Sequence, residues 1–323
     1  MDNSIVLVCA ADDNYSMPLA ATTRSVVASM QNPHNLSLYI IDGGVLGANK
    51  KRIIENLKSE QVKVTWIKAP TSQFKNMQIS STITIAAYYR LLIPEFLPTE
   101  TEKAIYIDSD VIVRSDIEAL WNQDVGDNYL LAVQDMGAPL VSSPRGLVNY
   151  QELGIPADYK YFNSGVLVFN LKKWRQNNTS LAVIKYLNDY KQQVRWHDQD
   201  GLNAVLAGKW GELDARWNQM PYLFRFGSWQ ESPFSEQEYN NLLNHPYIIH
   251  YSTREKPWND NCNHPQKKLF YEYLDNSIWS NWSVEQAGKK RRQKQMGVFQ
   301  NMYGSFKKQF KSFIPPTPRN SGG

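Results

Sequence analysis

The stretch "AIYIDSDVIV", residues 104–113, decides how the rest of this sequence is interpreted. Asp108, Ser109 and Asp110 interrupt an apolar run that is typical of a strand buried on both faces. We therefore predict one strand over 103–113, in which alternation places both carboxylates on the same face. A buried carboxylate is costly unless it is paired or binds a metal.

Two explanations of this carboxylate pair are open from these residues alone. A divalent cation would remove the repulsion between Asp108 and Asp110, and oxygen ligands suit Mg²⁺ or Mn²⁺. Alternatively, the two acids stand at the end of a strand and cap a following helix. Their position inside an apolar run favours the metal.

Strands and helices alternate on both sides of this stretch. Predicted strands cover 4–11, 36–42, 62–69 and 129–135, and predicted helices cover 17–30, 47–59 and a segment that starts at 82 and ends at Pro94. This order is typical of parallel βαβ units in a doubly wound α/β sheet. Ligands bind at the carboxyl ends of such strands, where we expect Asp12, Asp108, Asp110 and Asp135 to gather.

The second half of the chain adds polar candidates beside apolar segments. His250, at the end of a predicted strand, is either a third metal ligand or a hydrogen-bonded structural residue. Lys256 either meets a phosphate or is a solvated loop charge. Asn163, Asp198 and Gln199 either form a sugar pocket or cap helices, and their spacing alone favours capping.

Composition limits the class of protein. The chain has 323 residues, 42% of them apolar and 20% charged, as in an ordinary soluble domain. No segment approaches the roughly 20 apolar residues that cross a bilayer, and the first residues lack the features of a signal peptide. Two cysteines do not make a disulfide framework, so we expect a reducing cytoplasm. The sequence has no Gly-x-Gly-x-x-Gly or Walker-type loop, which disfavours dinucleotide binding and P-loop phosphoryl transfer.

Charge is distributed unevenly along the chain. Residues 286–323 contain nine Lys or Arg and no Asp or Glu, whereas the preceding residues carry a net charge of −5. Placed on a helix, 296–314 gathers aromatic and Met side chains on one stripe flanked by lysines, which is typical of a helix at a membrane surface. The alternatives are a helix docked on the protein's own core and a solvated charged face. The acidic body disfavours nucleic acid as a partner.

Six segments, taken in order, resemble one family. The chain is similar to the retaining glycosyltransferases of family eight, especially the bacterial lipooligosaccharide α-galactosyltransferases, over residues 5–262. The segments are "AADDNY" (10–15), "AAYYRL" (86–91), "YIDSDVIV" (106–113), "YFNSGVLVFNLKKWR" (161–175), "DQDGLN" (198–203) and "HYSTREKPW" (250–258). The resemblance implies an α/β fold of the GT-A type, the Rossmann-like fold of nucleotide-diphospho-sugar transferases.

The resemblance also implies roles for individual residues. Mn²⁺, with Mg²⁺ as the alternative, would be held by Asp108, Asp110, His250 and the pyrophosphate of UDP. The nucleotide would contact Ala10, Asp12, Asn14, Asp108, Ser109 and Lys256. The sugar would contact Arg90, Asp135, Asn163, Asp198 and Gln199. The catalytic candidates are Gln199, nearest the β face of the sugar, and Asp198, which would orient the sugar.

Two positions depart from the family pattern. Thr82 stands where the galactosyltransferases usually have His, and Thr253 replaces a Gly in the loop that ends in Lys-Pro-Trp. Glycine lets a backbone approach a phosphate closely, so Thr253 would instead offer its hydroxyl. These departures bear on the donor and acceptor more than on the class of reaction.

The sequence thus predicts a retaining hexosyltransferase that moves galactose or glucose from a UDP-sugar to a glycan, lipid-linked or surface-polymer acceptor. We assign 1–275 to catalysis, 276–314 to a basic amphipathic segment on an anionic membrane surface, and 315–323 to a disordered tail. The expected location is the cytoplasm, peripheral on the inner face of the cell membrane. The alternatives are a metal-dependent nucleotidyltransferase and a non-enzymatic membrane-surface binding protein.

Overall fold

The computed structural model describes residues 4–69, 77 and 85–282, so the predictions for Thr82, 296–314 and 315–323 lie outside it. The chain divides into two compact units, Met1–Ile278 and Trp279–Gly323. The described helices are α1 (Ser16–Ser29), α2 (Gly47–Leu57), α3 (Ile93–Phe96), α4 (Ile117–Trp121), α5 (Leu171–Gln176), α6 (Thr179–Asp189), α7 (Asp198–Leu206), α8 (Glu236–Asn244), α9 (Lys267–Glu272) and α10 (Asn276–Trp279). None of these described helices is long and apolar enough to cross a membrane.

A seven-stranded sheet forms the middle of the first unit. Its spatial order is β3 (Lys63–Lys68), β2 (Leu36–Asp42), β1 (Ile5–Ala11), β4 (Lys103–Ile107), β7 (Phe162–Asn170), β6 (Leu130–Gln134) and β8 (Gly211–Glu212). Strands β3, β2, β1 and β4 are parallel, whereas β7 is antiparallel to both β4 and β6. Since β4 and β6 both oppose β7, the carboxyl ends of β1, β4 and β6 lie at one edge of the sheet.

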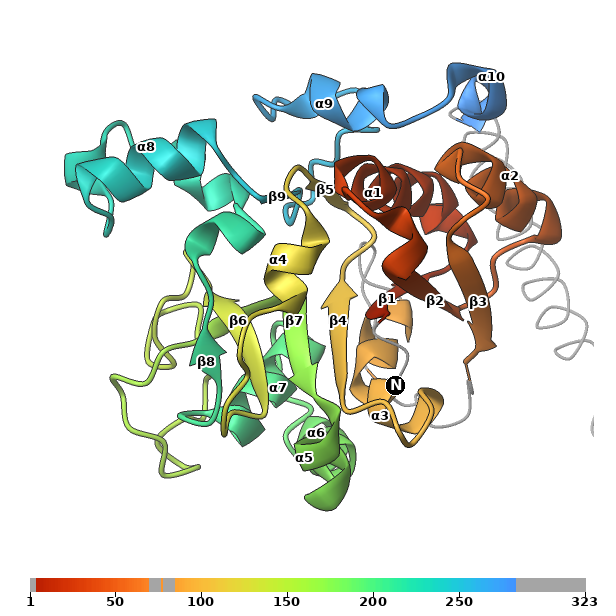
Figure 1. Ribbon diagram of the computed structural model, residues 1–323. Helices are drawn as coiled ribbons and strands as arrows, with labels where there is room; N and C mark the ends of the chain where they lie inside the picture. Colours follow the sequence, from red (N-terminus) through yellow and green to blue (C-terminus); the bar gives the residue numbers. More distant parts are fainter. Residues whose placement is uncertain (1–3, 70–76, 78–84, 283–323) are drawn as a thin grey trace, which may run out of the picture. The chain divides into compact units, whose positions relative to one another are not determined.

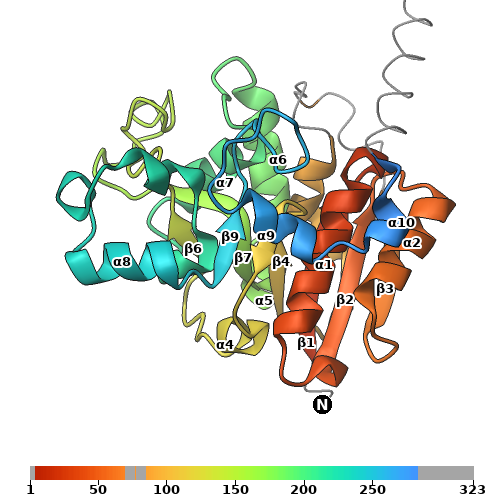
Figure 2. The same ribbon diagram turned by 90° about the horizontal axis from the view of Figure 1, so that it is seen from above.

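This arrangement confirms the predicted α/β fold, and the reversed strand β7 is the part that strand–helix alternation did not predict. Figures 1 and 2 both place β1–β3 with α1 and α2 at one end of the sheet and β6 and α8 at the other. The sheet edge at which β1, β4 and β6 end runs between these two groups of elements. Segments from both halves of the chain therefore line it. Ligand sites of α/β sheets form at such an edge.

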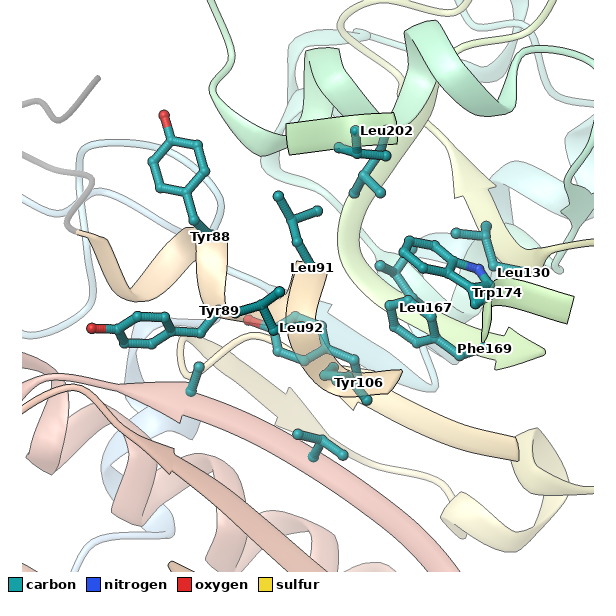
Figure 3. Close-up of a cluster of buried hydrophobic side chains, with 14 of the residues drawn as sticks. Tyr88, Tyr89, Leu91, Leu92, Tyr106, Leu130, Leu167, Phe169, Trp174 and Leu202 are labelled. Atoms are coloured by element: carbon teal, nitrogen blue, oxygen red, sulfur yellow. The ribbon is translucent and has the colours of Figure 1, made fainter. Parts of the chain in front are cut away.

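A large apolar core holds the middle of the sheet against its helices. Figure 3 shows Leu167 and Phe169 of β7 close to Trp174 of α5. Tyr88, Tyr89 and Leu91, from the segment Ile85–Leu92, belong to the same buried cluster. Tyr88 and Tyr89 are almost fully buried. Aromatic side chains of this size bury much apolar surface, so they fix Arg90, their neighbour in sequence, at the end of β4.

Residues 103–113 do not form one strand, so that prediction is wrong. Strand β4 ends at Ile107, and β5 (Val111–Val113) pairs with β9 (Ile248–His250) in a separate two-stranded sheet beside α1. The chain turns between them because Asp108 and Asp110 carry carboxylates that an apolar strand interior cannot solvate. Strand alternation therefore does not explain why both carboxylates face the same site.

The helix predicted from residue 82 to Pro94 is also corrected. Residues Ile85–Leu92 form a 3₁₀ helix, η3, and Pro94 lies in the first turn of α3 and does not end a helix. Proline lacks an N–H, which the first turn of a helix does not need. The tighter η3 directs Arg90 toward the sheet edge, where its guanidinium contacts Asp108.

Candidate active site

A cavity of about 730 Å³ lies at the edge where β1, β4 and β6 end. One part of it, named the nucleotide end after the roles predicted for its residues, contains Ala10, Asp12, Ser109 and Lys256. Another part, named the sugar end in the same way, contains Asp135, Asn163, Asp198 and Gln199. The Asp108, Asp110 and His250 cluster lies in the same cavity. The carboxyl-edge site expected from the sequence is thus a single concave pocket.

His250 lies against Asp108 and Asp110 although it is distant from them in sequence. One ligand atom of each lies within 4.8 Å of the others. His250 Nε2 is 3.4 Å from an oxygen of Asp110 and 3.7 Å from an oxygen of Asp108. Pairing of β5 with β9 places His250 opposite Val111, the residue after Asp110, so the small sheet assembles the cluster.

A hydrogen-bond chain fixes the ring of His250. Nδ1 donates to Asn218 Oδ1 (2.9 Å), and Asn218 Nδ2 donates to Asn163 Oδ1 (2.9 Å). Asn163 Oδ1 also accepts from the backbone N–H of Gly165 (3.0 Å), while Asn163 Nδ2 donates to Asp135 Oδ2 (3.1 Å). A proton on Nδ1 leaves the lone pair of Nε2 facing the carboxylates, which is how outer partners orient a metal-binding histidine.

The backbone beside this cluster leaves room only for glycine. A Cβ on Gly165 would stand 2.2 Å from Cε1 of His250 and 2.9 Å from Oδ2 of Asp108. Strand β7 therefore passes directly against the cluster, and its carbonyl at Gly165 accepts from the N–H of Asp108 (2.8 Å). Two carboxylates and one oriented imidazole in this cradle fit a divalent cation such as Mn²⁺ or Mg²⁺.

Asp108 is held from its other side by buried cationic and phenolic groups. Its Oδ1 accepts from Arg90 Nη2 (2.8 Å) and from the hydroxyl of Tyr106 (2.7 Å), which leaves Oδ2 toward His250. Arg90 is 4% exposed and also pairs with Asp198, Nε to Oδ2, at 3.2 Å. The guanidinium therefore connects the Asp108, Asp110 and His250 cluster to the sugar end.

Asp110 is paired with Lys256. The ammonium lies 2.5 Å from Asp110 Oδ2 and donates to the carbonyl of Tyr251 (2.6 Å). Burial alone would raise the pKa of Asp110, but the charge of Lys256, together with the neighbouring His250, outweighs burial and holds that pKa below its usual range. The carboxylate is therefore ionised, as a metal ligand must be.

The sugar end is built from amides and acids that do not cap helices. Gln199 Nε2 donates to Asp135 Oδ2 (3.1 Å), and its Oε1 accepts from the N–H of Ser164 (3.0 Å). Asp198 accepts from the hydroxyl of Ser164 (3.2 Å), and burial raises its pKa although Arg90 offsets part of the rise. The preceding residue, His197, has a φ of +53°, a strained backbone that is concentrated at functional sites.

At the nucleotide end, the β4–β5 turn is tied to the end of β1. Ser109 Oγ donates to the carbonyl of Ala10 (2.7 Å). Asp12 accepts from the N–H groups of Asn14 and Tyr15 (2.9 and 3.2 Å). Asn14 is exposed and does not line the cavity, whereas Tyr15 does. The nucleotide-binding role of Asn14 stays a prediction.

Sequence comparison agrees with this geometry. The model of a family described as "Glycosyl transferase family 8" matches residues 6–262. The chain belongs to glycosyltransferase family 8. Its relatives in that family include General stress protein A of Bacillus subtilis (strain 168), 33% identical over 282 residues, which are 86% of this chain and 96% of the relative. A lipopolysaccharide 1,2-glucosyltransferase of Escherichia coli (strain K12) is 25% identical over 85% of this chain and 79% of that protein.

A solved galactosyltransferase structure has a similar fold. Galactosyltransferase LgtC, in complex with donor and acceptor sugar analogues, matches with a TM-score of 0.72 and 29% identity, over 83% of this chain and 95% of that chain. The likeness establishes a GT-A fold of the nucleotide-sugar transferases for this chain. The family assignment and the glycosyltransferase activity expected from the sequence are thus confirmed.

Several residues of the site were not predicted from the sequence. Gly165 and Ser164 lie inside a segment that carries the resemblance, so close attention to that segment could have identified them. Asn218 ends the short helix η4 (Ala215–Asn218), outside every such segment, and only its contact with His250 reveals it.

Thr253 lies on the cavity wall, where its hydroxyl donates to the carbonyl of Glu255 (3.3 Å).

Proposed function

We propose that this family 8 glycosyltransferase moves a hexose, galactose or glucose, from a UDP-sugar to a glycan or glycolipid acceptor. In this proposal Mn²⁺ is held by Asp108, Asp110 and His250, and the product keeps the anomeric configuration of the donor. One observation carries it: the oriented Asp-Asp-His cluster is joined through Asn218 and Asn163 to the sugar end of the same cavity.

The roles of the other residues follow from their positions. A divalent cation held by Asp108, Asp110 and His250 would supply a Lewis acid toward the charge that develops on departing UDP. Lys256 supplies a second positive charge at the same place. Ala10 and Asp12 would bind the nucleoside, while Arg90, Asp135 and Asn163 would orient the sugar through its hydroxyls.

Retention of configuration is supported by the groups at the sugar end. Gln199 presents an amide, which is a poor nucleophile, and both ends of that amide are hydrogen-bonded. Asp198 is buried and paired with Arg90, so it would orient the sugar and not attack it. Attack on the face that UDP leaves, with the departing phosphate taking the acceptor's proton, requires no protein nucleophile.

A panel of UDP-sugars with Mn²⁺ tests this proposal. We expect release of UDP from UDP-galactose or UDP-glucose, and NMR of the anomeric proton should show an α linkage. Asp110→Ala should abolish turnover and metal-dependent UDP binding while circular dichroism shows an intact fold. Release of pyrophosphate would instead indicate a nucleotidyltransferase, and a β linkage from an α donor would contradict retention.

The acceptor and location are proposed from the relatives and the charge pattern. Lipopolysaccharide 1,2-glucosyltransferases are among the relatives, so a membrane-bound or surface glycan acceptor is consistent with the family. The basic segment within 276–314 would hold the enzyme on an anionic inner membrane surface in the cytoplasm. A binder without enzymatic activity is the alternative, and the test above excludes it if UDP is released.

A further inference from the structure

Two arginines at the sugar end have no role in the proposed reaction. Arg145 and Arg225 line the cavity, and both are exposed. Among the ion pairs of residues 4–69, 77 and 85–282, none involves either of them. Three carboxylates of the cavity are already paired with other cations, Asp108 and Asp198 with Arg90 and Asp110 with Lys256. Asp135 also lines the cavity, where it accepts from Asn163 and Gln199. The two arginines therefore carry positive charge that no ion pair of the described residues neutralises.

The two guanidiniums are held in place by aromatic rings. Arg145 lies over Trp196 at 4.5 Å and Arg225 lies over Tyr222 at 4.8 Å, measured from the guanidinium carbon to the ring centroid. Both rings line the cavity. Stacking on an aromatic ring orients a guanidinium while its N–H groups stay available for another partner.

The positions of these rings place the arginines at the sugar end. Tyr222 lies against Gly137, where an added Cβ would be 3.5 Å from the ring, and Gly137 follows Asp135 by two residues. Trp196 precedes Gln199 by three residues, and its indole N–H donates to the carbonyl of Arg145 (2.7 Å). The nucleotide end has its own cations, so these two guanidiniums are not needed for the diphosphate.

The loop that carries Arg145 is fixed to the start of α7. The guanidinium of Arg195 donates to the carbonyls of Pro144 (2.9 Å) and Gly146 (2.5 Å). The backbone N–H groups of Arg195 and Trp196 donate to Asp200 Oδ2 (2.6 and 2.8 Å). The wall is thus organised before any ligand arrives, which reduces the entropy lost on binding.

We infer that the acceptor sugar carries an anionic group, a phosphate or a carboxylate, which Arg145 and Arg225 bind beside the hydroxyl that is glycosylated. This inference rests on the proposed function and names the acceptor class that the function leaves open. Guanidiniums oriented on aromatic rings are groups that bind phosphate and carboxylate through several hydrogen bonds. A neutral acceptor would leave both of these charges without a partner.

Calorimetry on the full chain tests the inference without requiring turnover. With the enzyme saturated by UDP and Mn²⁺, methyl glucoside, its 6-phosphate and methyl glucuronide are titrated. At least one anionic sugar should bind about tenfold tighter than methyl glucoside. Arg145→Gln combined with Arg225→Gln should remove that preference and leave the affinity for UDP unchanged. A tighter 6-phosphate identifies phosphate as the anion, and a tighter glucuronide identifies carboxylate.

Arg216→Gln is the matched control. Arg216 also lies over a tyrosine ring, that of Tyr247 at 4.2 Å, but it pairs with Asp214 and does not line the cavity. This variant should keep the anionic preference. Equal binding of the three sugars to the wild type, or a preference that survives the double substitution, would overturn the inference. Failure of the proposed function would show separately, as absence of UDP release from every UDP-sugar.

Discussion

At the scale of single residues, Gly165 sets how closely β7 approaches the cluster of Asp108, Asp110 and His250. The neighbouring His250 is almost fully buried and cannot move away from an added methyl group. Backbone geometry at this position is ordinary, because Gly165 is not among the glycines with positive φ. The demand for glycine therefore comes from space alone.

Gly165→Ala should lower the affinity for Mn²⁺ at least tenfold and destabilise the fold by about 1–3 kcal/mol, because the new methyl group overpacks the cluster. Titration of Mn²⁺ by calorimetry, and urea unfolding, measure the two effects. Gly47→Ala is the control, since nothing lies within 4 Å of its added Cβ at the start of α2. Unchanged Mn²⁺ affinity in Gly165→Ala would contradict the placement of the cation.

Among residues that would not touch the metal, Asn218 should have the largest effect on metal affinity. Asn218→Ala leaves Nδ1 of His250 without its acceptor, so the ring loses its fixed orientation. Loss of such an outer partner costs about 10–100-fold in metal affinity. Asn188→Ala, which removes an exposed amide from α6, should leave metal affinity unchanged. If both variants bind Mn²⁺ like the wild type, the hydrogen-bond chain has no part in orienting His250.

At the scale of elements, the loop between β9 and α9 contains a histidine that cannot easily become charged. His264 lies among the rings of Phe224 and Tyr251, and its Nδ1 accepts from the N–H of Gln266 (3.2 Å). Burial lowers the pKa of His264 to about 4. In the unfolded chain the same group would titrate near 6.5.

This difference predicts a loss of stability in weak acid. Between pH 6.5 and pH 4 the unfolded chain binds a proton at His264 and the folded chain does not, so the free energy of unfolding falls as pH falls through this window. The contribution is about 2 kcal/mol, and it is fully present above pH 6.5. Urea unfolding at pH 7 and pH 4.5 should show a smaller loss in His264→Asn. The exposed His34→Asn should behave like the wild type.

An element could be predicted from the sequence when its own residues define it, but not when it depends on which distant strand it pairs with. Strands β1, β2, β3 and β6 were predicted because each is an apolar run with polar ends. The break between β4 and β5 was not, since composition does not show that Val111 pairs with His250 and Ile105 with Leu7. Most of the polar candidates line one cavity, but whether Asp198 caps a helix or binds Arg90 is decided by tertiary contacts.

At the scale of the whole molecule, removal of the basic segment beyond the described residues should abolish membrane contact and leave catalysis intact. A chain that ends at residue 285 loses nine positive charges and keeps every residue of the cavity. It should keep activity on soluble acceptors and fail to sediment with anionic liposomes at low salt, because each basic residue near such a surface contributes about 1 kcal/mol.

A full-length control distinguishes charge from length in that experiment. Replacing Lys307, Lys308 and Lys311 by Gln keeps the segment but removes three charges. Sedimentation should fall to an intermediate level and become less sensitive to salt. Equal sedimentation of the wild type and the truncated chain would show that the segment does not bind the membrane.

The small sheet of β5 and β9 has a consequence for the kinetics of folding. It joins residues near 110 to residues near 250, and closing so long a loop costs entropy before any contact forms. The cation site should therefore assemble after the rate-limiting step. Mn²⁺ should then slow unfolding and leave the refolding rate unchanged, which stopped-flow chevron plots with and without Mn²⁺ would measure. The cation would bind only after the rate-limiting step of folding and would slow unfolding of the native structure. Faster refolding in Mn²⁺ would show that the cation site forms before or during that step.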